Sequence, residues 1–295
     1  MSMEISKLIK LLDDNIKYDS IEEIINGDCC IVFKVKINDE IYYFKFLRKD
    51  MYKNILLEID VVDYLNNNGV LVPRYYSQNS KKIFSDDEYV FYATKEVDGE
   101  KSSRLVDYNL MKDIIENVAI MHKELRRYPI NNIDYLERET DFRRLQRFIY
   151  DNNDFLNKYE LKDFINRCLK YDDLSDDYML IHADLNFRNI FVKDNKFSSF
   201  IDFTDMRIGC KEDDLGKLWQ NILYLDNINI DDLKEFRIIY ENILKDNINI
   251  NNLIISCVYR IIYRFYYMIK NREEISDDYL DKTKKVLEKV LMREV

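Results

Sequence analysis

The segment 178–203 constrains the fold of this chain more than any other, because its apolar runs and turn residues alternate in a fixed order. The pair Asp194-Asn195 stands between two lysines and accepts the positive φ angles of a two-residue hairpin turn. Short apolar runs before and after that pair predict strands over residues 178–181, 190–192 and 197–201. The segment therefore predicts a strand, a loop and a hairpin.

Polar side chains stand in the loop before this hairpin and directly after it. Asp184 and Asn189 lie in the loop, five positions apart, and Asp202 follows the returning strand. We expect these oxygen-bearing side chains to converge on one small space. Transfer of a γ-phosphoryl group needs Mg²⁺, which prefers oxygen ligands, and a carboxylate that orients the attacking hydroxyl. Protein kinases carry an Asp and an Asn at this spacing and a second Asp before a Phe, which is Phe203 here.

These motifs resemble those of the aminoglycoside phosphotransferase family, the small-molecule branch of the protein-kinase-like fold. The family pattern is His-Gly-Asp-x-x-x-x-Asn, then Ile-Asp-Phe, then a further Asp. The matching residues here are His182-Ala183-Asp184, Asn189, Ile201-Asp202-Phe203 and Asp214-Leu215. Ala183 replaces the usual Gly, so the backbone must accept a Cβ atom there. Thr204 stands where a protein kinase places its third Gly, which argues against that branch.

The resemblance implies a role for each matching residue. It implies that Asp184 orients the acceptor hydroxyl and takes its proton, and that Asn189 and Asp202 hold Mg²⁺. His182 and Asp214 would support the catalytic loop, Asp214 through backbone amides. The implied cofactors are ATP or GTP together with Mg²⁺, and the implied partner is a small-molecule acceptor with a hydroxyl group.

A lysine and a glutamate in the first hundred residues form a candidate ion pair. Period-two alternation over residues 41–47 places Tyr43, Lys45 and Leu47 on one face of a strand. Glu58 falls on the apolar stripe of a helix predicted over residues 55–65, and a buried carboxylate needs a cation. Lys45 is the natural partner, because kinases pair a strand Lys with a helix Glu at the nucleotide phosphates. The alternative places Glu58 at the solvated edge of the stripe.

Two further segments resemble nucleotide-binding parts of the same family. Gly27 occupies the place of the nucleotide-covering loop, although an ordinary hairpin turn explains a single glycine equally well. The end of a strand predicted over 89–95 resembles the hinge that binds adenine. The resemblance implies that the Lys95 carbonyl and the Val97 amide bind the base, and that Thr94 closes the back of the pocket.

The rest of the chain is predicted to be mostly helical. Residues 110–125 carry an amphipathic stripe, which includes His122 as a packed residue rather than a catalyst. Residues 141–170 predict one or two helices, and an aspartate-rich stretch at 213–214 predicts the start of another. An aromatic stripe later in the chain is typical of core: Tyr259, Tyr263, Tyr266 and Tyr267.

The composition of the chain limits the expected cellular compartment and the classes of binding partner. The 295 residues include 45 basic and 55 acidic ones, and the net charge of −10 disfavours nucleic acid and anionic membranes. Five cysteines form no C-x-x-C pair, which indicates a reduced chain in the cytoplasm. The N-terminus lacks a signal-peptide pattern, and the apolar stretch 253–269 contains two arginines, so no membrane partner is expected. The oligomeric state is left open.

The fold expected from these observations is α+β and two-lobed, like that of protein kinases. Residues 1–97 would form a small nucleotide-binding sheet lobe, and residues 98–295 a larger, mainly helical lobe with the catalytic and acceptor-binding residues. The expected reaction moves the γ-phosphate to a small, cationic acceptor of the aminoglycoside type. Two alternatives stay open: a metabolite kinase for choline, ethanolamine, homoserine, thiamine or a sugar, and a non-catalytic pseudokinase that serves as an interaction module.

The cationic acceptor is inferred from carboxylates that follow Asp202. Asp205, Glu212 and Asp213 would form an acidic rim on the acceptor side, with Arg207 and Lys211 as the only evident partners nearby. A solvated helix start is the other interpretation of these residues. Two arginines, Arg260 and Arg264, would instead favour an acceptor carboxylate if they lined the cleft.

Overall fold

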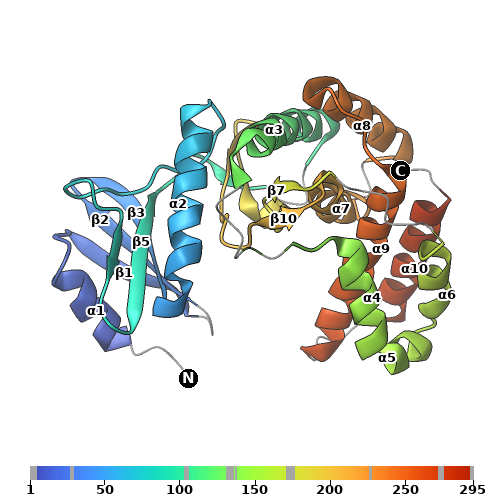
Figure 1. Cartoon of the computed structure of the whole chain (residues 1–295), viewed down its shortest axis with the longest axis horizontal. Helices are drawn as coiled ribbons and strands as arrows, with labels where there is room; N and C mark the ends of the chain where they lie inside the picture. Colours follow the sequence, from blue (N-terminus) through green and yellow to red (C-terminus); the bar gives the residue numbers. More distant parts are fainter. Residues whose placement is uncertain are drawn as a thin grey trace. The chain divides into compact units, whose positions relative to one another are not determined.

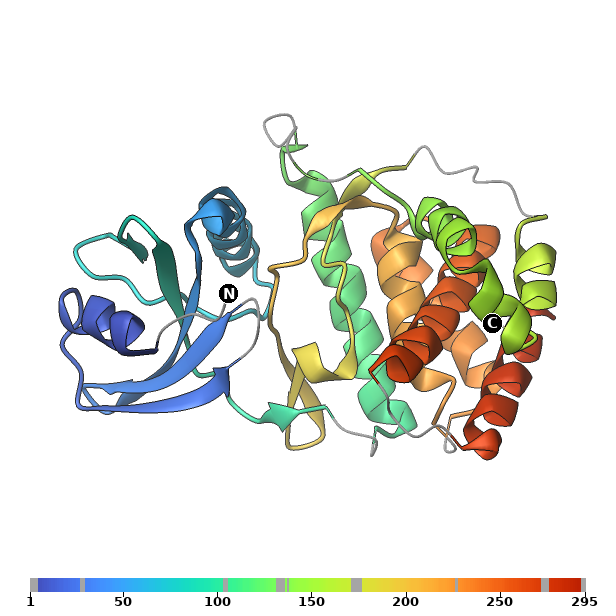
Figure 2. The ribbon, with the colours of Figure 1, turned by 90° about the horizontal axis from the view of Figure 1, so that it is seen from below.

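The computed structural model describes residues 5–26, 30–102, 106–130, 136, 138–170, 177–225, 228–271 and 276–292. The chain divides into two compact units (Figures 1 and 2). The first contains Met1–Gly99 and Ser198–Thr204, and the second contains Glu100–Phe197 and Asp205–Val295. The first unit thus ends two residues later than expected and takes in the segment that carries Asp202, which the sequence did not indicate.

The first unit is built on an antiparallel sheet of five strands in the order β1-β2-β3-β5-β4. The strands are β1 (Ser20–Asn26), β2 (Ile31–Ile37), β3 (Glu40–Arg48), β4 (Ile83–Ser85) and β5 (Tyr89–Lys95). Helix α1 (Ile5–Asp13) precedes the sheet, and a 3-10 turn, η1 (Lys49–Met51), leads from β3 into helix α2 (Tyr52–Asn67). Asn38 and Asp39 link β2 to β3 with φ angles of 50° and 66°, as a tight hairpin requires.

The two faces of this sheet carry separate apolar clusters. Phe44 and Phe46 of β3 pack with Leu8 and Leu12 of α1 on one face. Leu47 packs on the other face with Ile55 and further residues of α2. Because side chains alternate along a strand, Lys45 lies on the α2 face with Leu47, as the sequence predicted.

The second unit combines helices with two small sheets. Its helices are α3 (Tyr108–Arg127), α4 (Asp141–Asp151), α5 (Asn153–Lys158), α6 (Lys162–Cys168), α7 (Lys211–Ile222), α8 (Ile230–Leu244), α9 (Ile250–Lys270) and α10 (Asp277–Leu291). Its strands are β6 (Glu100–Lys101), β7 (Met179–Ile181), β8 (Ile190–Lys193) and β10 (Arg207–Gly209), together with the start of β9 (Lys196–Phe200), whose residues from Ser198 on belong to the first unit. They form a β6-β8-β9 sheet and a β7-β10 pair. The 3-10 turn η3 (Phe187–Asn189) precedes β8. The predicted hairpin is present, with φ angles of 50° and 57° at Asp194 and Asn195.

Helix α9 lies at the centre of the second unit, in contact with α4, α6, α7 and α10 (Figures 1 and 2). Its approach to α7 is close, because a Cβ atom at Gly216 would stand 2.1 Å from the Oγ of Ser256. The aromatic stripe on α9 is less buried than the sequence indicated. Tyr259 is buried, whereas Tyr263 and Tyr267 are 43% and 55% exposed. Within the described residues, none of the helices combines the length and the apolar character needed to cross a bilayer.

Candidate active site

The loop between β7 and β8 carries the candidate catalytic base, Asp184. The amide Nδ2 of Asn189 donates to the Asp184 carboxylate Oδ2 at 2.8 Å and to its backbone carbonyl at 2.9 Å. The turn that brings Asn189 back is capped by Asn186, whose side chain accepts a hydrogen bond from the Arg188 amide. The Asp184 side chain is 31% exposed, so its carboxylate is held in place and still open to a reactant.

The residue before Asp184 adopts a backbone conformation that favours glycine. Ala183 has a φ of 66°, in the left-handed region, where a Cβ atom costs about 1–2 kcal/mol. Both oxygens of Asp214 compensate for this conformation by accepting the amides of His182 and Ala183, at 2.8 and 2.7 Å. His182 is fully buried, and its Nδ1 accepts the amide of Asp184 at 3.3 Å. These hydrogen bonds connect His182 and Asp214 to the backbone of the catalytic loop, and the supporting roles that the family resemblance implies for them stay predictions.

Asp214 has a further partner within the core. The Nε2 of His122 lies 3.0 Å from its carboxylate, and the Nδ1 of His122 lies 2.6 Å from the Tyr240 hydroxyl. Burial raises the pKa of Asp214, but the hydrogen bonds from His122 and from the His182 amide outweigh burial and hold that pKa below its ordinary value. Asp214 therefore stays ionised as a fixed support, and His122 is a buried structural residue, as its place on an apolar stripe predicted.

A lysine that sequence reasoning missed also contacts the catalytic base. Lys217 of α7 places its Nζ 3.3 Å from the Asp184 Oδ1. Lys217 follows Asp214 by three positions, so both side chains lie on one face of the helix. That spacing is the sequence signal that could have identified it.

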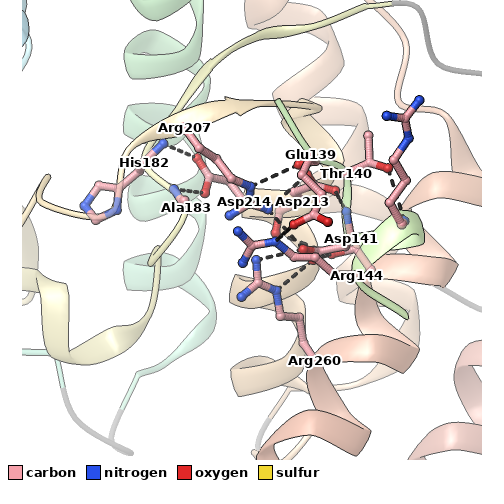
Figure 3. A network of polar contacts seen from close by, with 12 residues as sticks. Glu139, Thr140, Asp141, Arg144, His182, Ala183, Arg207, Asp213, Asp214 and Arg260 are labelled. Carbon is pink, nitrogen blue, oxygen red and sulfur yellow. Dashed lines mark hydrogen bonds and ion pairs between the residues drawn. The ribbon is translucent and has the colours of Figure 1, made fainter. Parts of the chain in front are cut away.

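A buried ionic network adjoins the supports of the catalytic loop (Figure 3). Asp141, at the start of α4, accepts hydrogen bonds from Arg207 at 3.0 Å and from Arg260 at 2.7 and 3.0 Å. Arg207 also donates to Asp213 at 3.1 Å, and Ser256 donates to Asp141 at 2.6 Å. The network joins α4, β10, α7 and α9, and so fixes the helices beside the loop.

This network corrects two expectations about the acceptor side. Asp213 and Glu212 are only 3% and 1% exposed, and Glu212 accepts the Asn249 amide at 2.8 Å, so neither belongs to an exposed acidic rim. Their place at a helix start buries them, because α7 packs on α9 through its first turn. Asp205 is exposed and remains a candidate. Arg260 is buried in the network and does not offer its charge to an acceptor.

The first unit holds a second polar cluster, around Lys45. The Lys45 Nζ donates to Asp202 Oδ1 at 2.9 Å and to the Thr204 hydroxyl at 2.7 Å. Asp202 has a φ of 62°, and this left-handed residue turns the chain so that Thr204 lies 2.8 Å from its carboxylate. Burial lowers the pKa of Lys45, but Asp202 and Glu58 together raise it above its ordinary value. Lys45 is therefore a fixed cation.

Glu58 is buried and belongs to this same cluster. Its carboxylate accepts hydrogen bonds from the hydroxyls of Tyr92 at 2.9 and 3.0 Å, Tyr75 at 3.1 Å and Thr204 at 3.2 Å. Thr204 thus links Glu58 to Lys45, where the sequence predicted a direct ion pair. Burial raises the pKa of Glu58, which the Lys45 charge opposes. The solvated-edge interpretation of Glu58 is wrong.

The remaining nucleotide-binding candidates lie along and after β5. Thr94 is half-buried within the strand, opposite Tyr43. The Lys95 amide donates to the Arg74 carbonyl at 2.8 Å, and the Lys95 side chain pairs with Glu40. Val97 is half-buried beyond the end of the strand. Their roles in binding adenine stay predictions, and Gly27 lies outside the described residues.

The donor sets in both units suit magnesium. Asp202 contributes a carboxylate whose side chain is 45% exposed. Asn189 directs its amide nitrogen to Asp184, which leaves its amide oxygen facing away from that residue. Among the described residues, no group of three or more His, Cys, Asp or Glu side chains is placed to hold a metal ion.

The comparisons with known proteins agree with this class of fold. The model of the phosphotransferase enzyme family matches residues 32–241, so the chain belongs to that family. The structure is similar to amicoumacin kinase hAmiN in complex with AMP-PNP, Ca²⁺ and Ami, with a TM-score of 0.72 at 15% identity over 98% of this chain and 94% of that one. A search of curated sequences gave no match.

Two further solved structures show the same protein-kinase-like fold. Spectinomycin phosphotransferase APH(9)-Ia, in complex with ADP and spectinomycin, has a TM-score of 0.64 at 14% identity, over 100% of this chain and 98% of that one. The GDP complex of wild-type aminoglycoside 2'-phosphotransferase-IIIa has a TM-score of 0.61 at 15% identity, over 99% and 100%. The α+β, two-lobed fold expected from the sequence is thereby confirmed.

Proposed function

We propose that this phosphotransferase moves the γ-phosphate of ATP or GTP to a hydroxyl group of a small molecule. The observation that carries the proposal is the catalytic loop. Asp184 is oriented by Asn189 and remains partly open to solvent, in a loop that Asp214 holds through backbone amides. A pseudokinase needs none of these bonds to a partly exposed carboxylate.

In the proposed reaction, Asp184 accepts a hydrogen bond from the acceptor hydroxyl and takes its proton as the oxygen attacks the γ-phosphorus. Lys45 contacts the α- and β-phosphates, in a position set by Asp202, Thr204 and Glu58. Asn189 and Asp202 would together hold Mg²⁺, which supplies charge neutralisation on the phosphates when bound. Positioning and electrostatic stabilisation account for most of the catalysis of such reactions.

The hinge after β5 is the proposed site of the nucleotide base. The Lys95 carbonyl and the Val97 amide would bind the adenine edge, and Thr94 would close the pocket behind it. Adenine and guanine present different hydrogen-bonding edges to such backbone groups. Turnover with ATP and with GTP, measured separately, therefore identifies the nucleotide that is used.

For the acceptor we propose an amino sugar or a related cationic molecule. Supporting features are the exposed Asp205 and a cleft of about 290 Å³ that is lined by the Asp151 carboxylate and the rings of Phe148 and Tyr263. The cleft also contains Glu139, whose carboxylate pairs with Arg144 and Arg147. Aromatic rings and carboxylates suit a sugar ring that carries amino groups. Amicoumacin and spectinomycin are ligands in the complexes of two similar structures, which is consistent with this class.

A nucleotide-consumption screen tests the proposal directly. ATP and GTP are each offered with Mg²⁺ and a panel of amino sugars, amino alcohols, amino acids and neutral sugars. We expect turnover with an amino sugar, near-complete loss of turnover in Asp184→Asn with nucleotide affinity within a few-fold of wild type, and weaker binding of the metal–nucleotide complex in Asp202→Asn. Turnover only with amino alcohols, amino acids or neutral sugars would identify a metabolite kinase instead. Wild-type turnover by both variants would refute the catalytic assignment.

A further inference from the structure

Lys217 occupies a position that the proposed mechanism has not used. Its Nζ lies 3.3 Å from the Oδ1 of Asp184, while Asn189 holds the Oδ2 of the same carboxylate at 2.8 Å. The carboxylate of Asp184 is therefore contacted by residues of two elements, the loop before β8 and helix α7. Each oxygen of a carboxylate has two lone-pair directions, so both retain room for an acceptor hydroxyl.

The surroundings of Lys217 make this contact unusual for a helix lysine. Its side chain is 24% exposed. Burial and the nearby positive charge of Arg260 lower its pKa, while Asp184 and Asp141 raise it, and the net pKa lies below the ordinary value. Asp141 already binds Arg207 and Arg260 directly, so within the described part of the chain Asp184 is the carboxylate that Lys217 contacts.

A second lysine on the same helix shows what a purely structural lysine does here. Lys211 pairs with Asp177, Glu212 and Asp246 at 2.8 to 3.5 Å and so neutralises carboxylates that carry no catalytic role. Lys217, by contrast, places its ammonium group on the one carboxylate that must exchange a proton during turnover. The fold gains little from that arrangement, because a partly buried pair is offset by the cost of desolvating both charges.

We propose that Lys217 is a positioning residue for Asp184 and stabilises the negative charge of the phosphoryl group as it is transferred. The inference rests on the proposed function and deepens it. It assigns to α7 a cation on the acceptor side of the reaction, in addition to Lys45 on the nucleotide side.

The charge balance of the transfer explains why this cation acts in the transition state. The acceptor oxygen forms a bond to the γ-phosphorus, the bond from that phosphorus to the bridging oxygen of the nucleoside diphosphate breaks, and the hydroxyl proton passes to Asp184. Asp184 becomes neutral and no longer compensates Lys217. The ammonium then interacts more strongly with the phosphoryl oxygens, so its stabilisation is larger in the transition state than in the ground state.

The experiment compares five variants with wild type, using phosphate release from MgATP with water as the acceptor; one of them, Lys217→Ala, is used for chemical rescue by ethylammonium. Lys217→Met removes the charge and keeps the length of the side chain, Lys217→Arg keeps the charge, and Lys211→Met is the matched control on the same helix. Asp184→Asn reports on the catalytic base itself. Melting temperature and AMP-PNP affinity are measured for every variant, so that a folding defect is separated from a catalytic one.

We expect Lys217→Met to lower kcat by about 100-fold, the scale found when one charge-stabilising donor is removed, with KM for ATP within threefold. Lys217→Arg should recover at least a tenth of wild-type kcat, and ethylammonium should partly rescue Lys217→Ala. Lys211→Met should lower the melting temperature and leave kcat within about twofold. If Asp184→Asn is inactive while Lys217→Met retains kcat within threefold, only the Lys217 assignment fails. If Asp184→Asn is active, the proposed function itself fails.

Discussion

Replacing Thr204 with valine is a small change in side-chain volume, but it should disturb the polar cluster around Lys45. The Thr204 hydroxyl lies 2.7 Å from Lys45, 2.8 Å from Asp202 and 3.2 Å from Glu58. A hydroxyl has one proton, so at any moment it accepts from Lys45 and donates to one of the two carboxylates. Valine keeps the shape of the side chain and removes both interactions.

The magnitude follows from the partners that remain. Hydrogen bonds to charged groups contribute about 1.5–3 kcal/mol each, so the loss of two would reach about 3–6 kcal/mol if nothing replaced them. Lys45 keeps Asp202, and Glu58 keeps the hydroxyls of Tyr75 and Tyr92. We therefore expect Thr204→Val to lower the free energy of unfolding by about 2 kcal/mol, which corresponds to a fall in melting temperature of roughly 4–8 °C.

The assay separates stability from function. Thr204→Val should also raise KM for MgATP, by up to about 30-fold if the full 2 kcal/mol were expressed in the placement of Lys45. Thr204→Ser, which keeps the hydroxyl, should stay within about twofold in KM and within about 2 °C in melting temperature. A Thr204→Val protein with both values unchanged would show that Lys45 and Glu58 are positioned without this bridge.

Other consequences concern the second unit. Asp214→Asn turns an NH₂ group toward one of the amides that Asp214 now accepts, and should cost about 3–5 kcal/mol in denaturant unfolding together with most of the activity. Gly216→Ala places a methyl group 2.1 Å from the Ser256 hydroxyl and should cost about 1–3 kcal/mol in denaturant unfolding. Burial and the Asp141 carboxylate raise the pKa of Asp213 to about 8 from an ordinary value of 3.8, so the folded chain holds an extra proton between those values. Its free energy of unfolding should therefore fall as pH rises from about 4 to about 8, by up to about 1.4 kcal/mol per pH unit, and Asp213→Asn should flatten that slope in melting curves.

The parts of the fold that local sequence determines were predictable. The hairpin at Asp194-Asn195 follows from two residues that tolerate positive φ, and the inward face of β3 follows from strict alternation. Helix α2 follows from its apolar stripe, which also placed Glu58 in the interior. Each of these predictions needed only contacts within one element or between neighbouring elements.

The return of residues 198–204 to the first unit was not predictable in this way. The segment joins that unit through the Phe200 amide, which donates to the Leu71 carbonyl, and through Asp202 and Thr204. A hydrogen bond between backbone groups does not depend on the residue types that make it, so the sequence does not indicate it. In addition, more than a hundred positions separate the partners. The bridging role of Thr204 was missed for the same reason, since the sequence showed only that glycine was absent there.

The acidic stretch after Asp202 shows how burial, rather than residue type, decides the role of a charge. Asp205 is exposed, Glu212 and Asp213 are buried with partners, and Asp214 is fully buried on α7, where it accepts amides of the catalytic loop. A helix that packs on α9 through its first turn must bury the acidic residues that begin it, whatever their sequence suggests. The buried carboxylates of α7 therefore serve contacts inside the second unit rather than attract the acceptor, and Asp214 is the one that supports the catalytic loop.

Helix α7 also carries a positively charged residue that contacts the candidate catalytic base. One turn beyond Asp214, Lys217 reaches the carboxylate of Asp184. Asp214 and Lys217 thus contact the catalytic loop from the same helix. Asp214 binds the backbone amides of the loop, and Lys217 contacts the side chain of the base, Asp184. Because helix geometry fixes the spacing between them, a displacement of α7 should move both together. The buried network of Asp141, Arg207 and Arg260 that anchors this helix should consequently affect kcat through Asp184, although none of its members contacts that residue directly.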